Sequence, residues 1–440
     1  MEQLELFVDR RNLFEKLHSI EFLYKGFKAV KKNKGAPGID DVTIQDFEVD
    51  LDSNLRQLIE EIKGWKYRPS PVLRLEMPKP GKNAGTRLLG IPCVRDRVVQ
   101  AALKLILEPI LDPLFSDNSY GFRPNRNQRQ AVEAAQRIVK TGKEYVVDID
   151  LSKFFDRVHH DRLISRLAQH IDDKRILRII GMTLRSGVMK DGLYRPTDEG
   201  TVQGGPLSPL LSNVVLDELD KELESRSLEF CRFADDCNIF VSSRKAAQRV
   251  MDSISKFISN RLKLAVNQEK SNVALSKHVK FLGMTIIAGT IAISVVSMNR
   301  AMAKVKELTP RGTYQTLEKT IKGINKWYMG WSQYYGMTQY PGQLKKIEAH
   351  VRRRLRSRII GQQKKRRHLF NKLIKRGLSR SYAANTVYNN DGRWAISGKF
   401  AMAKAYSVPW FINQMGQQVK SDQKRTNPHW FSIDQWIRMT

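Results

Sequence analysis

The sequence predicts an α+β fold that gives way to a basic, helical part near residue 300. Short apolar runs such as residues 146–150 alternate with longer segments, such as residues 51–63, in which apolar residues recur every three or four positions. The charge changes near the same place. Residues 301–440 hold 28 Lys and Arg against 6 Asp and Glu, a net charge of +22 out of +31 for the chain. Such a step marks a change of domain and makes the C-terminal part the main electrostatic contact surface.

The composition points to a folded protein with a polyanionic partner. The 440 residues are enough for two to four domains, and the positive excess favours nucleic acid or an anionic membrane. No run is long and apolar enough to cross a bilayer, and the first ten residues lack the pattern of a secretion signal, so nucleic acid is favoured. The three cysteines show no disulfide framework or zinc-type spacing, which suits a reducing, cytoplasmic compartment.

Helices are predicted at residues 12–31 and 51–63, with a loop broken by Gly and Pro between them. The loop begins with Lys31, Lys32 and Lys34, which are suited to phosphate contacts. A solvated basic turn is the alternative.

Residues 72–77 alternate like a strand, and a Gly-rich turn leads into a second strand, which predicts a β-hairpin. Lys79 and Arg87 would lie on its facing strands, where two cations can clamp a triphosphate. Charges that only keep the hairpin soluble are the alternative. A helix is predicted to begin near Arg95.

Residues 115–126 mix aromatic residues with Arg123 and Arg126, a mixture suited to base stacking and phosphate contact. Core aromatics beside exposed arginines are the alternative. We assign His159 and His160 to a helix start rather than to a metal-ligand pair. The helices predicted in this part of the chain cover residues 129–140, 161–169 and 174–185.

Two predicted strand ends carry carboxylates. The run 146–150 ends on Asp150, and the apolar runs 229–233 and 237–241 flank Asp235 and Asp236 at the tip of a predicted hairpin. An isolated Asp-Asp pair is usually a solvated turn. Two strands that bring carboxylates to one place can instead hold two Mg²⁺ ions about 4 Å apart and support an in-line phosphoryl displacement.

The loop at residues 201–209 contains two glycines, which allow a backbone to approach a base pair closely; a helix N-terminal loop capped by Ser208 is the alternative. The elements predicted after it are helices at 207–225 and 244–262 and paired strands at 277–287 and 291–296.

The C-terminal part is predicted to be helical, basic and aromatic, with two dense cationic clusters. The first would form a basic ridge for RNA, because Arg352, Arg356 and the next turn share one helix face; a solvated face is the alternative. The first cluster comprises Arg352, Arg353, Arg354, Arg356 and Arg358, and the second comprises Lys364, Lys365, Arg366 and Arg367.

From about residue 20 to about residue 415, the order of these segments resembles the reverse transcriptases of bacterial group II introns. The resemblance implies a right-hand polymerase followed by a helical thumb and maturase domain. The matching motifs lie at residues 32–40, 87–92, 119–124, 150–156, 203–209, 233–236, 269–271, 281–283 and 327–335. The implied divisions are an N-terminal extension and fingers at 1–110, a palm with interleaved finger segments at 111–298, the thumb and maturase domain at 299–415 and a short tail at 416–440.

The resemblance also implies an activity, which is RNA-directed DNA synthesis with help in splicing and retrohoming of an intron RNA. The implied partners are intron RNA, an RNA template with a DNA primer, target DNA and deoxynucleoside triphosphates. The implied cofactor is Mg²⁺, as two ions, with Mn²⁺ as a substitute. The expected location is the bacterial cytoplasm, in a ribonucleoprotein or at the nucleoid.

Individual residues fall on functional positions of that family. The implied metal ligands are Asp150, Asp235, Asp236 and the backbone carbonyl of Leu151. The implied nucleotide contacts are Lys79 and Arg87 on the triphosphate, Phe155 against a ribose 2′-hydroxyl, Gln203 beside the nascent base pair and Lys270 near the primer terminus.

The sequence departs from the family pattern in two places. Phe233 replaces the usual Tyr, which removes a hydroxyl but no metal ligand. Only about twenty residues follow the maturase region, without the Cys/His set of a nuclease, which predicts the compact class that lacks the endonuclease.

Three functions remain open at this point: an intron-encoded reverse transcriptase and maturase, a related enzyme captured by the host for defence or repair, and a splicing factor without polymerase activity. The first two share every palm residue, and only a flanking intron separates them. The three intact carboxylates count against the third, since a pure RNA-binding protein gains nothing by facing them toward a polyanion.

Overall fold

The computed structural model divides the chain into two compact units, the first ending at Val279 and the second beginning at Lys280. The boundary predicted between residues 298 and 299 therefore lies inside the second unit. Within the described ranges no helix combines the length and apolarity needed to cross a membrane. The structure describes residues 12–78, 86–190, 193–197, 199–201, 204–310 and 312–411.

The N-terminal helices pack on a long buried helix. The segment predicted as one helix at 12–31 is two, because the Ser19 side chain caps a new start by accepting a hydrogen bond from the Phe22 N–H. The second of these helices packs on α5, and a Cβ at Gly26 would lie 2.6 Å from the Val98 carbonyl oxygen. The helices are α1 (Leu13–Leu17), α2 (Ile20–Asn33), α3 (Ile44–Val49), α4 (Leu51–Lys63) and α5 (Val94–Leu111).

A small sheet has the order β2-β1-β4-β5. Its first two strands form the predicted antiparallel hairpin, whereas β4 pairs parallel to β1 and was not predicted from the sequence. Its strands are β1 (Val72–Pro78), β2 (Thr86–Ile91), β4 (Val188–Lys190) and β5 (Leu193–Arg195).

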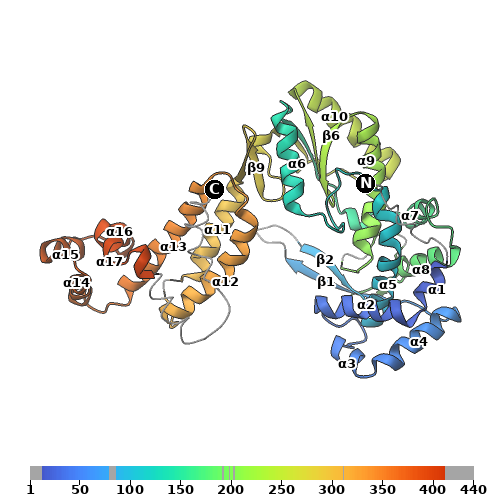
Figure 1. The fold of residues 1–440 in the computed structure, drawn as a ribbon, viewed down its shortest axis with the longest axis horizontal. Coiled ribbons are helices and arrows are strands. Elements are labelled where there is room, and N and C mark those ends of the chain that lie inside the picture. The colour runs from blue at the N-terminus through green and yellow to red at the C-terminus, as the bar shows by residue number, and fades with distance from the viewer. Residues whose placement is uncertain are drawn as a thin grey trace, which may run out of the picture. The chain divides into compact units, whose positions relative to one another are not determined.

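A second sheet, of four antiparallel strands in the order β6-β7-β3-β8, lies at the centre of the first unit. One face is apolar: Val147, Ile149 and Ile239 are completely buried. Helix α6 packs on β6 (Figure 1). Helix α10 packs on β3, β7 and β8. The strands are β3 (Tyr145–Ile149), β6 (Glu229–Phe233), β7 (Asp236–Val241) and β8 (Asn272–Leu275), and the helices are α6 (Gln128–Lys140), α9 (Ser208–Ser225) and α10 (Arg244–Phe257).

The remaining elements of this unit follow the predicted positions closely. Helix α7 begins at His160, as the sequence predicted, and the helix predicted at 244–262 changes to a π-helical turn after Phe257. These elements are α7 (His160–Leu167), α8 (Lys174–Leu184) and the short turns η1 (Asp112–Leu114), η2 (Phe154–Asp156), η3 (Ile258–Leu262) and η4 (Ser276–His278).

The second unit begins with a hairpin, β9 (Met284–Ile287) and β10 (Thr290–Ile293). Gln343 ties this hairpin to the helices: its amide donates to the Ile293 carbonyl (2.8 Å) and accepts from the Ile293 N–H (2.8 Å). The helices pack around Tyr328, Ile347 and Val351. They are α11 (Val295–Leu308), α12 (Leu317–Tyr335), α13 (Pro341–Gly361), α14 (Arg366–Lys375), α15 (Arg380–Val387), α16 (Arg393–Gly398) and α17 (Phe400–Ala405). The mixture of sheets and helices confirms the predicted α+β class.

Candidate active site and nucleic-acid interface

Strand register brings the predicted acidic residues to one end of the central sheet. Ile149 of β3 pairs with Cys237 of β7, so Asp150 follows β3 at the point where Asp236 begins β7. Asp235 lies in the two-residue turn between β6 and β7, which the Phe233–Asp236 pair closes. Beyond the Ile149–Cys237 pair, Asp150 and Asp236 are the next residues of the two neighbouring chains at the sheet end.

The backbone around Asp150 is held by the segment that precedes β8. The Asp150 N–H donates to Ser271 Oγ (3.0 Å), and the Asp150 carbonyl accepts from the Asn267 N–H (2.8 Å). Lys270 lies beside it, with Nζ 3.7 Å from Asp150 Oδ1, and both side chains are partly exposed. The lysine predicted to lie near the primer terminus is therefore adjacent to a predicted metal ligand.

The neighbouring row of the same face was not predicted from the sequence. Asn238 donates to Asp148 Oδ1 (2.9 Å), two residues further into the sheet than Asp150 and Asp236. Leu151, the next residue after Asp150, forms an isolated antiparallel β-bridge with Val266, and its side chain is buried.

The chemical type of the oxygen atoms at this sheet end suits a divalent cation. Three carboxylates and a backbone carbonyl are hard oxygen ligands of the type that Mg²⁺ prefers. The Asp150 side chain keeps 35% exposure, so an ion can reach it. Throughout the described ranges, however, no three Asp, Glu, His or Cys side chains form a ready-made metal-ligand cluster.

Phe155 lies in the turn η2, close to the end of β3. Its ring meets Phe154 edge to face, with centroids 5.2 Å apart, and its side chain is half-buried. The Phe155 carbonyl accepts a hydrogen bond from the Thr201 N–H (2.6 Å), which ties η2 to the loop before α9. Part of the ring thus remains available to a ligand.

Three predicted nucleotide contacts are not located by the structure. Lys79 and Gln203 lie outside the described residues, as does the side chain of Arg87, whose backbone pairs with Met77 in the hairpin. The glycine after Gln203 is closely packed: a Cβ at Gly204 would lie 2.4 Å from the Gly90 carbonyl oxygen of β2.

The prediction that Arg123 contacts nucleic acid is corrected by its position. Its side chain is buried, and all three guanidinium nitrogens donate within the fold, to Asp112 and to the carbonyls of Ser116 and Ser119. Arg126 is more exposed and pairs with Asp117. Arg123 braces the loop instead of offering an N–H to a phosphate.

The arginines of α13 also have partners within the fold, although most of them are less buried than Arg123. Arg353 stacks on Trp394, with Cζ 4.2 Å from the ring centroid, and Arg356 donates to the Tyr406 carbonyl (3.1 Å). Burial, together with the neighbouring charge of Arg352, lowers the pKa of Arg356 to about 10. Within the predicted basic ridge, Arg358 is buried and the other four arginines are half-buried.

The other predicted cations are exposed. They are Lys31 and Lys32 in the last turn of α2, with Lys31 paired to Glu48, Lys34 directly after that helix, and Lys364, Lys365, Arg366 and Arg367 at the start of α14.

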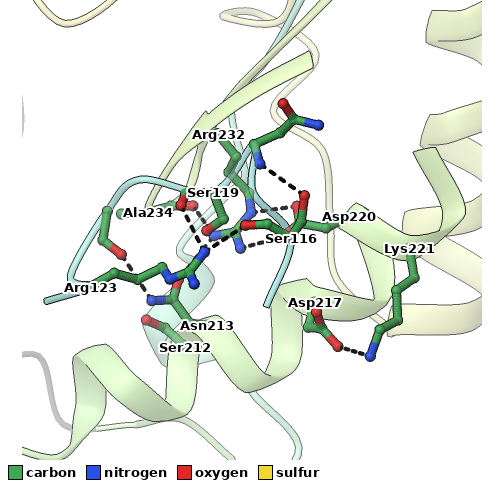
Figure 2. A network of polar contacts seen from close by, with 12 residues as sticks. Ser116, Ser119, Arg123, Ser212, Asn213, Asp217, Asp220, Lys221, Arg232 and Ala234 are labelled. Carbon is green, nitrogen blue, oxygen red and sulfur yellow. Dashed lines mark hydrogen bonds and ion pairs between the residues drawn. The ribbon is translucent and has the colours of Figure 1, made fainter. Parts of the chain in front are cut away.

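One residue of this site was missed from the sequence, although it begins the acidic motif. Arg232 is completely buried, pairs with the equally buried Asp220 of α9, and donates to the carbonyl of Ala234 in the acidic turn (Figure 2). An arginine between apolar residues of a strand, three residues before an Asp-Asp pair, is the signal that could have revealed it.

Two family models match the chain in sequence. "Reverse transcriptase (RNA-dependent DNA polymerase)" matches residues 77–286, and "Group II intron, maturase-specific domain" matches residues 298–376. Among solved structures, apo telomerase from Candida Tropicalis is 12% identical, with a TM-score of 0.45, over 83% of this chain and 69% of that one.

Curated relatives agree with the family models. Protein YkfC of Escherichia coli is 32% identical over 61% of this chain and 80% of that protein. The group II intron-encoded protein LtrA of Lactococcus lactis is 34% identical over 61% of this chain but only 43% of its own length. A putative COX1/OXI3 intron 2 protein of Saccharomyces cerevisiae is 31% identical over 56% of this chain and 29% of that protein. The chain therefore belongs to the group II intron reverse transcriptases that carry a maturase-specific domain.

Proposed function

We propose that the chain copies RNA into DNA at the end of the central sheet and binds an intron RNA to assist its splicing and retrohoming. The observation that carries the polymerase part is the β3–β7 register. In that register Ile149 pairs with Cys237, so Asp150 and Asp236 come next at neighbouring strand ends, with Asp235 in the adjoining turn. No protein nucleophile is required for this reaction, because the attacking group is the primer 3′-hydroxyl.

Asp150, Asp235 and Asp236, with the Leu151 carbonyl, would hold two Mg²⁺ ions, or Mn²⁺ in their place. When bound, such ions supply charge stabilisation for the attacking and leaving oxygens of an in-line displacement. Lys270, beside Asp150, is suited to hold the primer terminus or a phosphate near these carboxylates.

The remaining substrate contacts follow from the family positions. Phe155, half-exposed next to the end of β3, would press against C2′ of the incoming nucleotide and exclude a ribose. Lys79 and Arg87 would neutralise the triphosphate. Gln203 would lie beside the nascent base pair.

Intron RNA, and target DNA during retrohoming, would be held mainly through phosphates. The exposed cations at the start of α14 and at the C-terminal end of α2 would make such contacts. Family membership and the +22 charge of residues 301–440 support this second activity.

The test is Asp235→Asn, which removes one charge with little change of shape. We expect primer extension on an RNA template to fall by several orders of magnitude, since metal-ion stabilisation supplies several kcal/mol and each ~1.4 kcal/mol is tenfold in rate. RNA affinity should hardly change. Asp252→Asn, on the exposed face of α10, is the matched control and should extend normally. Normal extension by Asp235→Asn would overturn the assignment.

A further inference from the structure

Arg232 and Asp220 form an ion pair in the interior of the first unit, directly behind the acidic turn. Both side chains are 0% exposed, and the pair is bidentate: Nε donates to Asp220 Oδ1 (2.6 Å) and Nη2 donates to Asp220 Oδ2. Removing two charges from water is costly, and a well-packed apolar pair is often at least as stable. Stability alone therefore gives little reason for charges at this position.

The third guanidinium nitrogen reaches the acidic turn itself. Nη1 of Arg232 donates to the Ala234 carbonyl oxygen (2.9 Å) and to Asn213 Oδ1 (3.1 Å) (Figure 2). That carbonyl belongs to the same planar peptide unit as the Asp235 nitrogen, so holding its oxygen fixes the plane from which the Asp235 side chain starts. Ala234 also has a left-handed backbone, with φ of 57°, which a non-glycine residue adopts at some cost.

The other side of the turn is held by residues 118–121. The Tyr120 N–H donates to the Arg232 carbonyl (2.8 Å), and a Cβ at Gly121 would lie 2.2 Å from the Ala234 nitrogen. Asn213 joins the two sides, because its amide donates to the Gly121 carbonyl (2.9 Å) while its oxygen accepts from Arg232. The turn is thus clamped between α9 and this segment.

We infer that Arg232, anchored by Asp220 and Asn213, is a positioning residue that fixes the Ala234–Asp235 peptide plane and thereby the affinity of the acidic turn for its divalent cation. This inference rests on the proposed polymerase function of that turn. Arg232 is completely buried, which leaves it no surface for contact with a substrate. It acts through the turn backbone. A guanidinium suits this position because it can donate to the Asp220 carboxylate and to the Ala234 carbonyl at the same time.

Arg232→Lys separates this role from simple charge pairing. A lysine keeps the positive charge for Asp220, but a single ammonium cannot reproduce two parallel bonds to Asp220 and a third to the Ala234 carbonyl. The control is Leu219→Ala, which removes buried apolar volume from the neighbouring position of α9 without deleting a polar contact to the turn. Thermal unfolding of both variants shows whether their losses of stability are comparable.

The readout is cation binding rather than turnover. The full chain is assembled with an RNA template, a DNA primer ending in a dideoxynucleotide and the matching deoxynucleoside triphosphate, and Mn²⁺ is titrated while electron paramagnetic resonance counts the free ion. We expect Arg232→Lys to weaken Mn²⁺ binding by about tenfold, the lower end of the effect of changes behind metal ligands. The Mg²⁺ concentration for half-maximal extension with a normal primer should rise in parallel. Leu219→Ala should leave both values unchanged.

Two further variants make every outcome decisive. Asn213→Ala removes one acceptor from Arg232 and should shift Mn²⁺ binding in the same direction but less, and it decides the question if Arg232→Lys does not fold. Equal cation affinities for Arg232→Lys, Asn213→Ala and Leu219→Ala would overturn the positioning role. Asp235→Asn in the same titration tests the proposed function separately: if it binds Mn²⁺ and extends primers like the wild type, the turn is not the cation site. If it loses both while the other variants match Leu219→Ala, only the positioning role fails.

Discussion

Two consecutive stretches of the second unit, α13 and the start of α14, are both rich in cations but use them differently. Every arginine between Arg352 and Arg358 is half-buried or buried, and their partners lie in the same unit. Lys364, Lys365, Arg366 and Arg367 are all exposed. The density of positive charge in a sequence therefore does not say which cations face a nucleic acid. The residues that pack on the opposite side of the helix decide that.

The largest expected effect comes from changing Arg354, Arg356 and Arg358 of α13 to Gln together. Arg358 donates to Thr320 Oγ1 and the Gln315 carbonyl, and Arg354 donates to Thr309 Oγ1 (2.8 Å). Hydrogen bonds of charged groups contribute about 1.5–3 kcal/mol each. The free energy of unfolding of the second unit should fall by several kcal/mol, measured by thermal unfolding and limited proteolysis. Unchanged stability with weaker RNA binding would show that these arginines leave their internal partners to bind RNA.

A smaller effect, on binding alone, is expected when Lys364, Lys365, Arg366 and Arg367 are changed to Gln. Stability should change by less than about 0.5 kcal/mol, because these side chains are exposed. The slope of log affinity for intron RNA against log salt should flatten by about one unit for each phosphate that the variant no longer neutralises. The control changes four exposed cations of α10, Arg244, Lys245, Arg249 and Lys256, to Gln. Equal flattening in both variants would mean that only total charge matters.

The smallest expected effect is a pH dependence centred on His350, which shares α13 with the arginines. Burial, and then the charges of Arg354 and Arg353, lower the pKa of His350 below its usual value. Below about pH 6.5 the unfolded chain binds a proton that the folded chain resists, so His350 makes stability fall as the pH falls through this range. His350→Gln should reduce the loss of stability between about pH 7.5 and 5.5, measured by chemical denaturation. The same pH dependence in both proteins would place the titration elsewhere.

The acidic site was predictable because its signal is local. A short apolar strand that ends on Asp150, and a hairpin with Asp235 and Asp236 at its tip, are patterns of a few adjacent residues. Pairing of β3 with β7 then brings the two acidic strand ends to the same end of the sheet. Strands β4, β5 and β8 were missed because each is only three or four residues long and gains its stability from neighbours that are distant in sequence.

The roles of the arginines could not be predicted for the same reason. Whether Arg123, Arg232 or Arg356 faces water depends on Asp112, Asp220 and the Tyr406 carbonyl, which lie 11, 12 and 50 residues away. Helical periodicity places residues on a shared face, but it does not say whether another helix covers that face.

The hairpin of β9 and β10 affects where the polymerase part and the helical part of such proteins can be joined in a chimera. The reverse transcriptase match ends at residue 286, inside β9, and the maturase-specific match begins at residue 298, yet the hairpin belongs to the helical unit that starts at Lys280. Gln339 and Gln343 act as a substitute neighbouring strand, because their amides satisfy the backbone of Ile291 and Ile293. A chimera joined at residue 298 would separate them and leave an unpaired strand edge of the kind that promotes aggregation. The natural crossover point for recombining a polymerase with a new RNA-binding partner therefore precedes the hairpin, near residue 280.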